Sequence, residues 1–193
     1  MHLYFRVLWV LISSFFKPKI SSILETSVLR FKVLPNDLDF NMHMNNGRYL
    51  TIMDLGRFDL VLRAGLLQIM LKQKSVPILG SATIRYRLPL MPFQSYELHT
   101  RIVSWDDKWA YMEQRFVIAD GGKKHGAVAA VALVKGSFYD QRNKRTVPTK
   151  DVLDSAGLAV ETPEIPEHIV EWQKSEDFLR EVTKQEVNND QAS

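Results

Sequence analysis

The chain has 193 residues, of which 46% are apolar and 24% are charged, and it contains no cysteine. This composition excludes a disordered or low-complexity protein, and the length suits a single core of ordinary size. Disulfides, thiolate metal sites and a cysteine nucleophile are excluded too, and a net charge of +3 is too small to indicate a nucleic-acid-binding protein.

Residues 3–16 form the first apolar segment, LYFRVLWVLISSFF. A membrane-spanning helix needs about 20 apolar residues, so this segment is too short to cross a bilayer. On a helix, Arg6, Ser13 and Lys17 share one narrow stripe and apolar side chains cover the rest, a pattern typical of a helix lying in a membrane interface. The pattern leaves open an alternative, a helix packed on the domain or on a second subunit.

A strand and a long helix are predicted next. Alternating apolar residues predict the strand at 27–34, and a polar loop follows it. A helical period then runs from a cap at Asn45 or Asn46 to a stop at Gly65. Gly56 lies on the inner side of this helix, which predicts a close approach of other atoms to the helix backbone.

Four strands are predicted to follow this helix, without another helix. Their links are short and rich in turn residues, which predicts antiparallel pairing as a meander. A single sheet wrapped around one helix leaves an edge or a face to bury, so we expect a homodimer or a tetramer. The predicted strands are 77–86, 96–105, 109–118 and 126–139.

The last part of the chain is interrupted by three prolines and is predicted to be a helical extension. Thr149 is suited to cap a short helix that ends at residue 153, and an amphipathic helix is predicted at 167–182. Three regions are therefore expected: an N-terminal apolar segment at 1–20, one domain at 21–145 and a C-terminal helical extension at 146–193.

The loop before the long helix carries the residues best suited to chemistry. Asp37, Asp39, Asn41, His43 and Asn45 alternate with bulky apolar residues, so the five polar side chains are expected to face one way. They end where free N–H groups of the first helical turn attract negative charge. A carboxylate beside such a site supplies the parts needed to transfer an acyl group to water. Polar residues that only cap and turn the chain give the same pattern, and the loop alone leaves both interpretations open.

The string DLDFNMHMNNGRYL at 37–50 resembles the signature of hotdog-fold acyl thioesterases. The similarity covers about residues 27–138 and is closest to the subgroup typified by thioesterase superfamily member six. It implies an α+β hotdog fold, in which an antiparallel sheet wraps around one long central helix. It also implies hydrolysis of acyl thioesters, most simply acyl-CoA, to the free acid and CoA. The CoA thioester is then a substrate, and no cofactor, metal or nucleic acid is implied.

The resemblance also implies roles for single residues. Asp39 matches the carboxylate that acts as general base or nucleophile in thioesterases of the 4-hydroxybenzoyl-CoA type. Asp39, Asn41 and His43 match the catalytic Asp, Asn and His of plant acyl-ACP thioesterases. Those plant enzymes carry a further acidic or thiol residue downstream, and residues 72–80 here contain neither. The start of the helix matches the region that holds the thioester carbonyl, and we expect the substrate to contact Asn45, Asn46, Gly47, Tyr49 and Met53.

Two classes of function stay open at this point. One is a cytoplasmic thioester hydrolase whose active sites lie at a subunit boundary. The other is a non-catalytic protein of the same fold that binds acyl-CoA or lipid, favoured by the apolar segment at 3–16 and its potential for peripheral membrane contact. Candidate cations for the phosphates of CoA are Arg48, Arg85, Arg87 and Lys108.

Overall fold

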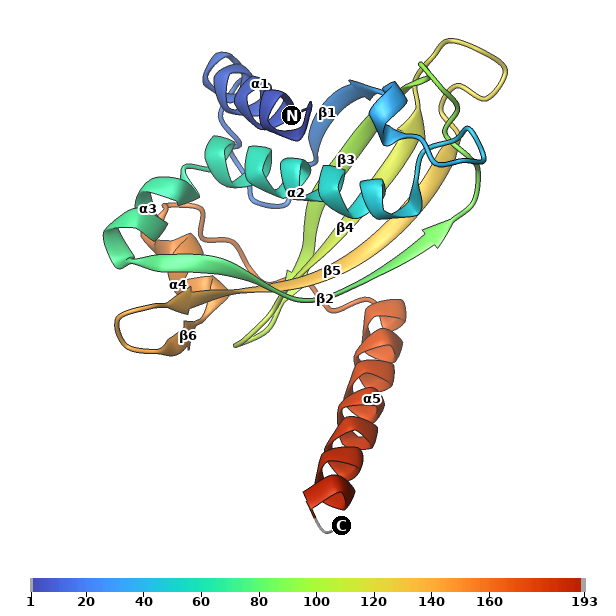
Figure 1. The fold of residues 1–193 in the computed structure, drawn as a ribbon. Coiled ribbons are helices and arrows are strands. Elements are labelled where there is room, and N and C mark those ends of the chain that lie inside the picture. The colour runs from blue at the N-terminus through green and yellow to red at the C-terminus, as the bar shows by residue number, and fades with distance from the viewer. Residues whose placement is uncertain (1, 192–193) are drawn as a thin grey trace. The chain divides into compact units, whose positions relative to one another are not determined.

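A computed structural model describes the backbone of residues 2–191 and the side-chain environments of residues 3–186 (Figure 1). It divides into two units, one ending at Thr162 and the other beginning at Pro163. The second unit holds the helix α5 (Glu167–Gln191), which is longer than the predicted 167–182. The region borders expected at residues 20 and 145 stay predictions.

A curled antiparallel sheet forms the centre of the first unit and wraps around one long helix, α2 (Asn46–Arg63), as predicted (Figure 1). The helix begins at the cap Asn45, whose side-chain oxygen accepts a hydrogen bond from the Gly47 N–H, and it ends just before Gly65. The strands are β1 (Ser27–Lys32), β2 (Ser75–Tyr86), β3 (Ser95–Trp105), β4 (Ala110–Ile118), β5 (Val128–Asp140) and β6 (Arg145–Val147).

The strand order corrects the predicted meander. The sheet runs β1-β3-β4-β5-β2, so β2 is an edge strand beside β5 and does not pair with β3. The link between β2 and β3, residues 87–94, crosses the end of the sheet: Leu88 donates to the Ala129 carbonyl at 3.0 Å, and Phe93 donates to the Val33 carbonyl at 3.0 Å. Eight extended residues reach about 26 Å, whereas three strand spacings amount to about 14 Å. A short link was therefore long enough for a crossover.

A second helix and a short strand are absent from the sequence-based prediction. The helix α3 (Leu66–Gln73) directly follows α2, with Gly65 at a φ of 71° between them, so the expectation of strands without a second helix is wrong here. Its period was visible in Leu66 and Met70, which lie one turn apart and are both buried. The short strand β6 pairs with β5. The predicted short helix is present as α4 (Thr149–Ser155), but its cap is Pro148.

The core lies between α2 and the concave face of the sheet. Tyr49, Ile52 and Met53 of α2 pack in one cluster with Leu98 and Phe116 of the strands. This packing holds the start of α2 firmly against the sheet, and the loop before α2 is thereby fixed in place.

The N-terminal segment is helical, as predicted: α1 (His2–Phe16) packs on this core by one side. Val10 is fully buried, and Leu3 and Val7 contact the same cluster. In the part of the chain that the structure describes, no helix has the length and apolar character needed to cross a bilayer.

Candidate active site

The loop between the short 3₁₀ helix at Pro35–Asp37 and α2 forms a tight turn that brings Asp39 and His43 together. The Asp39 N–H donates to the His43 carbonyl at 3.0 Å, and the Met42 N–H donates to the Asp39 carbonyl at 3.1 Å. Met42 has a φ of 57°, a left-handed conformation that is uncommon outside glycine and occurs often at functional sites. The turn places His43 Nδ1 3.5 Å from Asp39 Oδ2.

The Asp39 carboxylate is oriented by a hydrogen bond to one oxygen and is still partly exposed to solvent. Its Oδ1 accepts a hydrogen bond from the Asn41 N–H at 2.9 Å, while its Oδ2 faces His43. The side chain of Asp39 is 14% exposed and that of His43 is 34% exposed. At 3.5 Å the two side chains are farther apart than in a hydrogen bond. The carboxylate is therefore oriented and still reached by solvent, as a general base or nucleophile has to be.

The predicted alternation of polar and apolar side chains in this loop is wrong. Asp37 is completely buried, whereas the apolar Phe40 and Met42 at the tip of the turn are 93% and 59% exposed. The reason is geometric: a chain that reverses direction within a few residues does not keep the two-residue period of a strand. The loop is anchored instead where Leu38 and Met44 form an isolated bridge across the base of the turn.

Asp37, the first acidic residue of the motif, has a structural role. Its carboxylate oxygens accept hydrogen bonds from Arg6 at 2.8 and 2.5 Å and from the Leu34 N–H at 2.9 Å. Its carbonyl accepts the Asn45 N–H at 2.8 Å. Burial alone would lower the pKa of Arg6, but the hydrogen bond and the charge of Asp37 raise it above its ordinary value. Asp37 thus joins α1, the loop and the start of α2, and it is not free to act on a substrate.

The first turn of α2, which follows this loop, offers one free backbone donor among residues 46–48. We expected the Gly47 N–H to hold the thioester carbonyl, but it donates a hydrogen bond to Asn45 Oδ1 at 2.9 Å. The Arg48 N–H donates to the Asn45 carbonyl at 2.9 Å. Within residues 2–191, the Asn46 N–H makes no hydrogen bond. Asn46 therefore presents the positive end of the helix to an incoming oxygen.

Tyr86 is a neighbour of this site that the sequence analysis missed. It is the last residue of β2, and its hydroxyl donates to the Asn46 carbonyl at 3.0 Å. No sequence signal marked it, because its position depends on β2 lying at the sheet edge and not beside β3.

Tyr49 and Met53, expected to contact the acyl chain, are both buried in the core. The Tyr49 ring packs edge-on against Tyr86 and Phe116, with centroid distances of 5.1 and 4.7 Å. Burial raises the pKa of Tyr49 to about 12, and the nearby Tyr86 hydroxyl makes a smaller contribution in the same direction. Tyr49 therefore stays protonated in neutral solution and is not a base.

An apolar cavity of about 350 Å³ lies farther along α2. The second half of α2, together with α3, β2 and the neighbouring strands, forms its walls, and Asp39 is not among its lining residues. Arg57 is a cation in this wall: it donates to Gln114 Oε1 at 2.8 Å and pairs with Asp54. Burial lowers the pKa of Arg57, although Asp54 acts in the opposite direction. The cavity is thus an apolar space whose wall carries one ion pair, Arg57 with Asp54.

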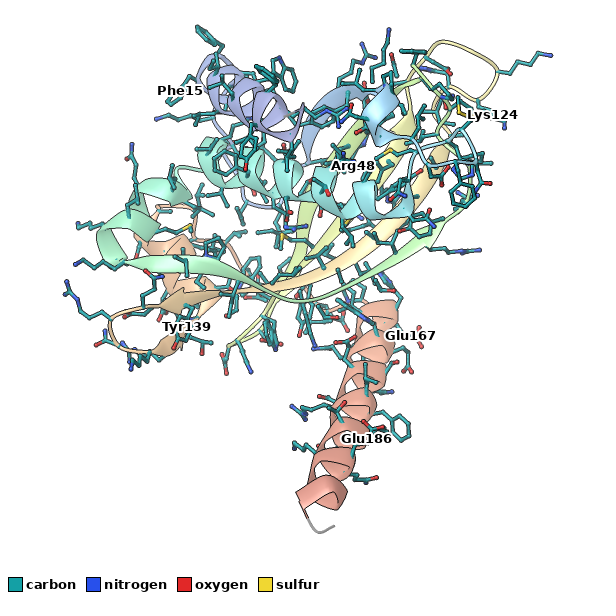
Figure 2. The ribbon with its side chains drawn as sticks, viewed as in Figure 1. Phe15, Arg48, Lys124, Tyr139, Glu167 and Glu186 are labelled. Carbon is teal, nitrogen blue, oxygen red and sulfur yellow. The ribbon has the colours of Figure 1, made fainter. Side chains whose placement is uncertain are left out.

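The four candidate cations for CoA are not equivalent. Arg48, on the first turn of α2 (Figure 2), donates to the Asn36 carbonyl at 3.0 Å. Lys108 lies 4.8 Å from the centre of the Trp109 ring, in the turn between β3 and β4. Arg85 and Arg87 are exposed and adjoin Tyr86 in the chain, but side chains alternate along a strand, so Arg85 is directed to the opposite face of β2 from the Tyr86 hydroxyl.

Known proteins with similar sequence or structure agree with this architecture. A family model described as the thioesterase-like superfamily matches residues 33–173. The chain is 37% identical to Protein THEM6 from Xenopus laevis over 168 residues, which cover 87% of this chain and 77% of that protein.

Two solved structures illustrate the shared fold. YbaW, a probable thioesterase from Escherichia coli, superposes with a TM-score of 0.58 at 21% identity, covering 68% of this chain and 96% of its own. The hypothetical protein SAV2348 from Staphylococcus aureus, solved in complex with CoA, superposes with a TM-score of 0.58 at 17% identity, covering 75% of this chain and 92% of its own. These structures confirm the predicted α+β hotdog fold. The chain therefore belongs to the thioesterase-like superfamily of hotdog-fold thioester hydrolases, and within it to the THEM6-like proteins.

Proposed function

We propose that this protein hydrolyses acyl-CoA to the free acid and CoA, with Asp39 as the group that activates water or attacks the carbonyl carbon. The observation that carries the proposal is the turn at 39–43. It orients one carboxylate, leaves that side chain partly exposed, and ends at the N-terminus of the longest core helix. The family supports hydrolysis of acyl thioesters in general, and CoA is the proposed thiol part of the substrate.

Two routes use the same groups. As general base, Asp39 accepts a proton from water while the water oxygen bonds to the thioester carbon. As nucleophile, Asp39 bonds to that carbon directly, and water then cleaves the resulting anhydride. In both routes the C–S bond breaks and the CoA thiolate leaves and takes up a proton. The free Asn46 N–H would stabilise the oxyanion, and Asn41 and His43 would position the carboxylate, the water or the carbonyl.

The acyl chain is proposed to run along α2 towards the apolar cavity. From Asn46 to Arg57 the helix rises about 16 Å, so a chain bonded to a thioester at the helix start has to be extended to reach the cavity wall. Leu50 is exposed on this helix, and Asp54 lines the cavity. Tyr49 and Met53 would support this path from within the core. A cavity of about 350 Å³ favours an aliphatic or aromatic acyl group over acetyl.

The active form is proposed to be a homodimer, alone or as half of a tetramer, joined along β2. This strand is twelve residues long, lies at a sheet edge and is exposed over much of its length. The opposite edge, β1, is covered: Lys17 donates to the Val28 carbonyl at 3.4 Å and Arg6 to the Lys32 carbonyl at 3.2 Å. An open edge strand exposes unpaired backbone N–H and C=O groups, which can pair with a strand of another chain. Because Tyr86 ends β2 beside Asn46, such a dimer would place each site at the subunit boundary.

The test is thiol release from palmitoyl-, hexanoyl- and benzoyl-CoA by the wild-type protein and by Asp39→Asn. We expect the wild type to hydrolyse at least one of the three, and Asp39→Asn to lose about 10² to 10⁴-fold in kcat, the usual loss for a general base. The matched control is Asp107→Asn, the same change at an exposed carboxylate in the turn between β3 and β4, which should keep wild-type activity.

Two results would contradict the proposal. Equal rates for Asp39→Asn and the wild type would remove Asp39 from the mechanism. Binding of acyl-CoA by calorimetry without any thiol release would favour the non-catalytic lipid-binding alternative.

A further inference from the structure

The helix α1 turns an apolar surface outward. Seven apolar side chains on it are between 45% and 85% exposed. A single exposed apolar residue is ordinary on a protein surface, but seven on one helix form a patch that calls for an explanation. Figure 2 shows Phe15 projecting away from the protein. We call this surface the outer face of α1, and five of its residues are aromatic: Tyr4, Phe5, Trp9, Phe15 and Phe16.

Two ion pairs hold the helix in this orientation. Arg6 binds the buried Asp37 near one end of α1, and Lys17, just past the other end, lies 3.2 Å from the buried Asp59. Both cations therefore point inward, the reverse of an ordinary surface helix. Rotating α1 to bury its aromatic residues would leave two buried carboxylates without these partners, which is strongly unfavourable. The two ion pairs thus fix the outer face of α1 towards the solvent.

Positive charge borders this face. A shallow groove of about 270 Å³ lies between α1 and β1, and the exposed cations Arg30 and Lys32 line it together with Phe5 and Trp9. Lys19 is exposed beyond the other end of the helix. Residues 3–16 contain no acidic residue. Two acidic residues pair with cations of the groove: the buried Asp37 with Arg6, and Glu97 with Arg30 at 3.2 Å.

We propose that the outer face of α1 docks on the surface of an anionic phospholipid bilayer. Its aromatic side chains would enter the interface between headgroups and acyl chains, and Arg30, Lys32 and Lys19 would lie at the level of the lipid phosphates. Aromatic residues bordered by cations are the composition that suits this boundary. A second copy of the chain fits less well, because a two-fold contact would bring the same positive border against itself. The inference is independent of the proposed catalysis.

The test is cosedimentation of the full-length protein with vesicles. We expect binding to vesicles of phosphatidylcholine with phosphatidylserine, and at least about tenfold weaker binding to phosphatidylcholine alone, because each cation near an anionic surface contributes to attraction. Raising the salt concentration should weaken the binding, since screening shortens the range of these charges.

Two variants separate the apolar and the charged contributions. Tyr4→Ser/Phe15→Ser/Phe16→Ser should lose about tenfold or more in binding, and Lys19→Gln/Lys32→Gln should lose the preference for phosphatidylserine. The matched control is Leu71→Ser/Phe178→Ser/Leu179→Ser, which removes three similarly exposed apolar side chains from α3 and α5. Circular dichroism checks that all variants are folded.

Three results would overturn the proposal. The wild type could fail to sediment with anionic vesicles. The α1 variant could bind vesicles as well as the control variant does. Finally, sedimentation velocity without lipid could show that the α1 variant changes the oligomeric mass while vesicle binding is unchanged, in which case the outer face is a protein–protein contact.

Discussion

Gly56 shows how a single residue sets the distance between helix and sheet. A Cβ atom at this position would lie 2.6 Å from Leu98 Cδ2 and 2.9 Å from Gln114 Nε2, and closer still to Thr100 Oγ1. Gln114 is itself fixed, because its side-chain amide donates to the Met53 carbonyl at 3.0 Å and to Thr100 Oγ1 at 2.9 Å. Because Gly56 has no side chain, α2 packs directly against the hydrogen-bonded pair of Thr100 and Gln114 in the sheet.

Replacing Gly56 by Ala should destabilise the protein even though alanine is the better helix former. Overpacking a core by one methyl group against fixed neighbours costs about 1–3 kcal/mol, which exceeds the gain of about 1 kcal/mol in helix propensity. Urea denaturation measures the difference. The control is Gly122→Ala, where the new methyl group meets only the side chain of Asp120; a Gly56→Ala protein as stable as the wild type would show that the helix can move away.

At the scale of secondary-structure elements, β3 and β4 are joined by a charged cluster on one face of the sheet. Arg101 and Glu113 are cross-strand partners, and Arg115 lies two residues farther along β4 on the same face. The carboxylate of Glu113 accepts hydrogen bonds from Arg101 at 3.0 Å and from Arg115 at 2.9 Å. Burial would raise the pKa of Glu113, but the two arginines together hold it below its ordinary value.

This depressed pKa predicts how stability depends on pH. The ionised Glu113 is favoured in the folded state, so its contribution is fully present above about pH 4.3, the ordinary value for glutamate. The contribution is lost as the pH falls through the lower folded-state pKa. The difference in unfolding free energy between the wild type and Glu113→Gln should therefore be largest at neutral pH and shrink below pH 4. Denaturation curves at pH 7, 5 and 3 test this, with the exposed Glu171→Gln as control. A difference that stays constant with pH would contradict it.

At the scale of the whole molecule, the two sheet edges differ in what covers them. β1 is short, and side chains of Arg6 and Lys17 bind its carbonyls, whereas β2 is twice as long and open. The protein thus has one edge available for pairing with a second copy.

Light scattering should therefore give a mass of about twice 22.3 kDa, or about four times that mass for a tetramer. A lysine placed on the exposed Thr83 of β2 should weaken the dimer, because charge on an edge strand opposes edge-to-edge pairing. Val28→Lys makes the same type of change on β1 and serves as the control. Dissociation by Val28→Lys but not by Thr83→Lys would assign the contact to the other edge.

Local features of this protein could be predicted from the sequence alone. A cap was predicted at Asn45 or Asn46 and lies at Asn45, and the stop at Gly65 and the close approach at Gly56 were correct. Caps, left-handed glycines and helical periods depend on neighbours a few residues away. The motif also brought Asp39 and His43 within four positions of each other, so their contact in one turn needed no distant residue.

Only the tertiary structure decided which parts of the motif are open. Asp37 and Asp39 stand two residues apart, yet Arg6, thirty-one positions away from Asp37, binds the first, while the second stays accessible. The place of β2 at the edge, the contact of Tyr86 with Asn46 and the cavity beside α3 likewise depend on how a curled sheet closes over a helix. Burial and strand order arise from contacts between distant segments, and no local period carries that information.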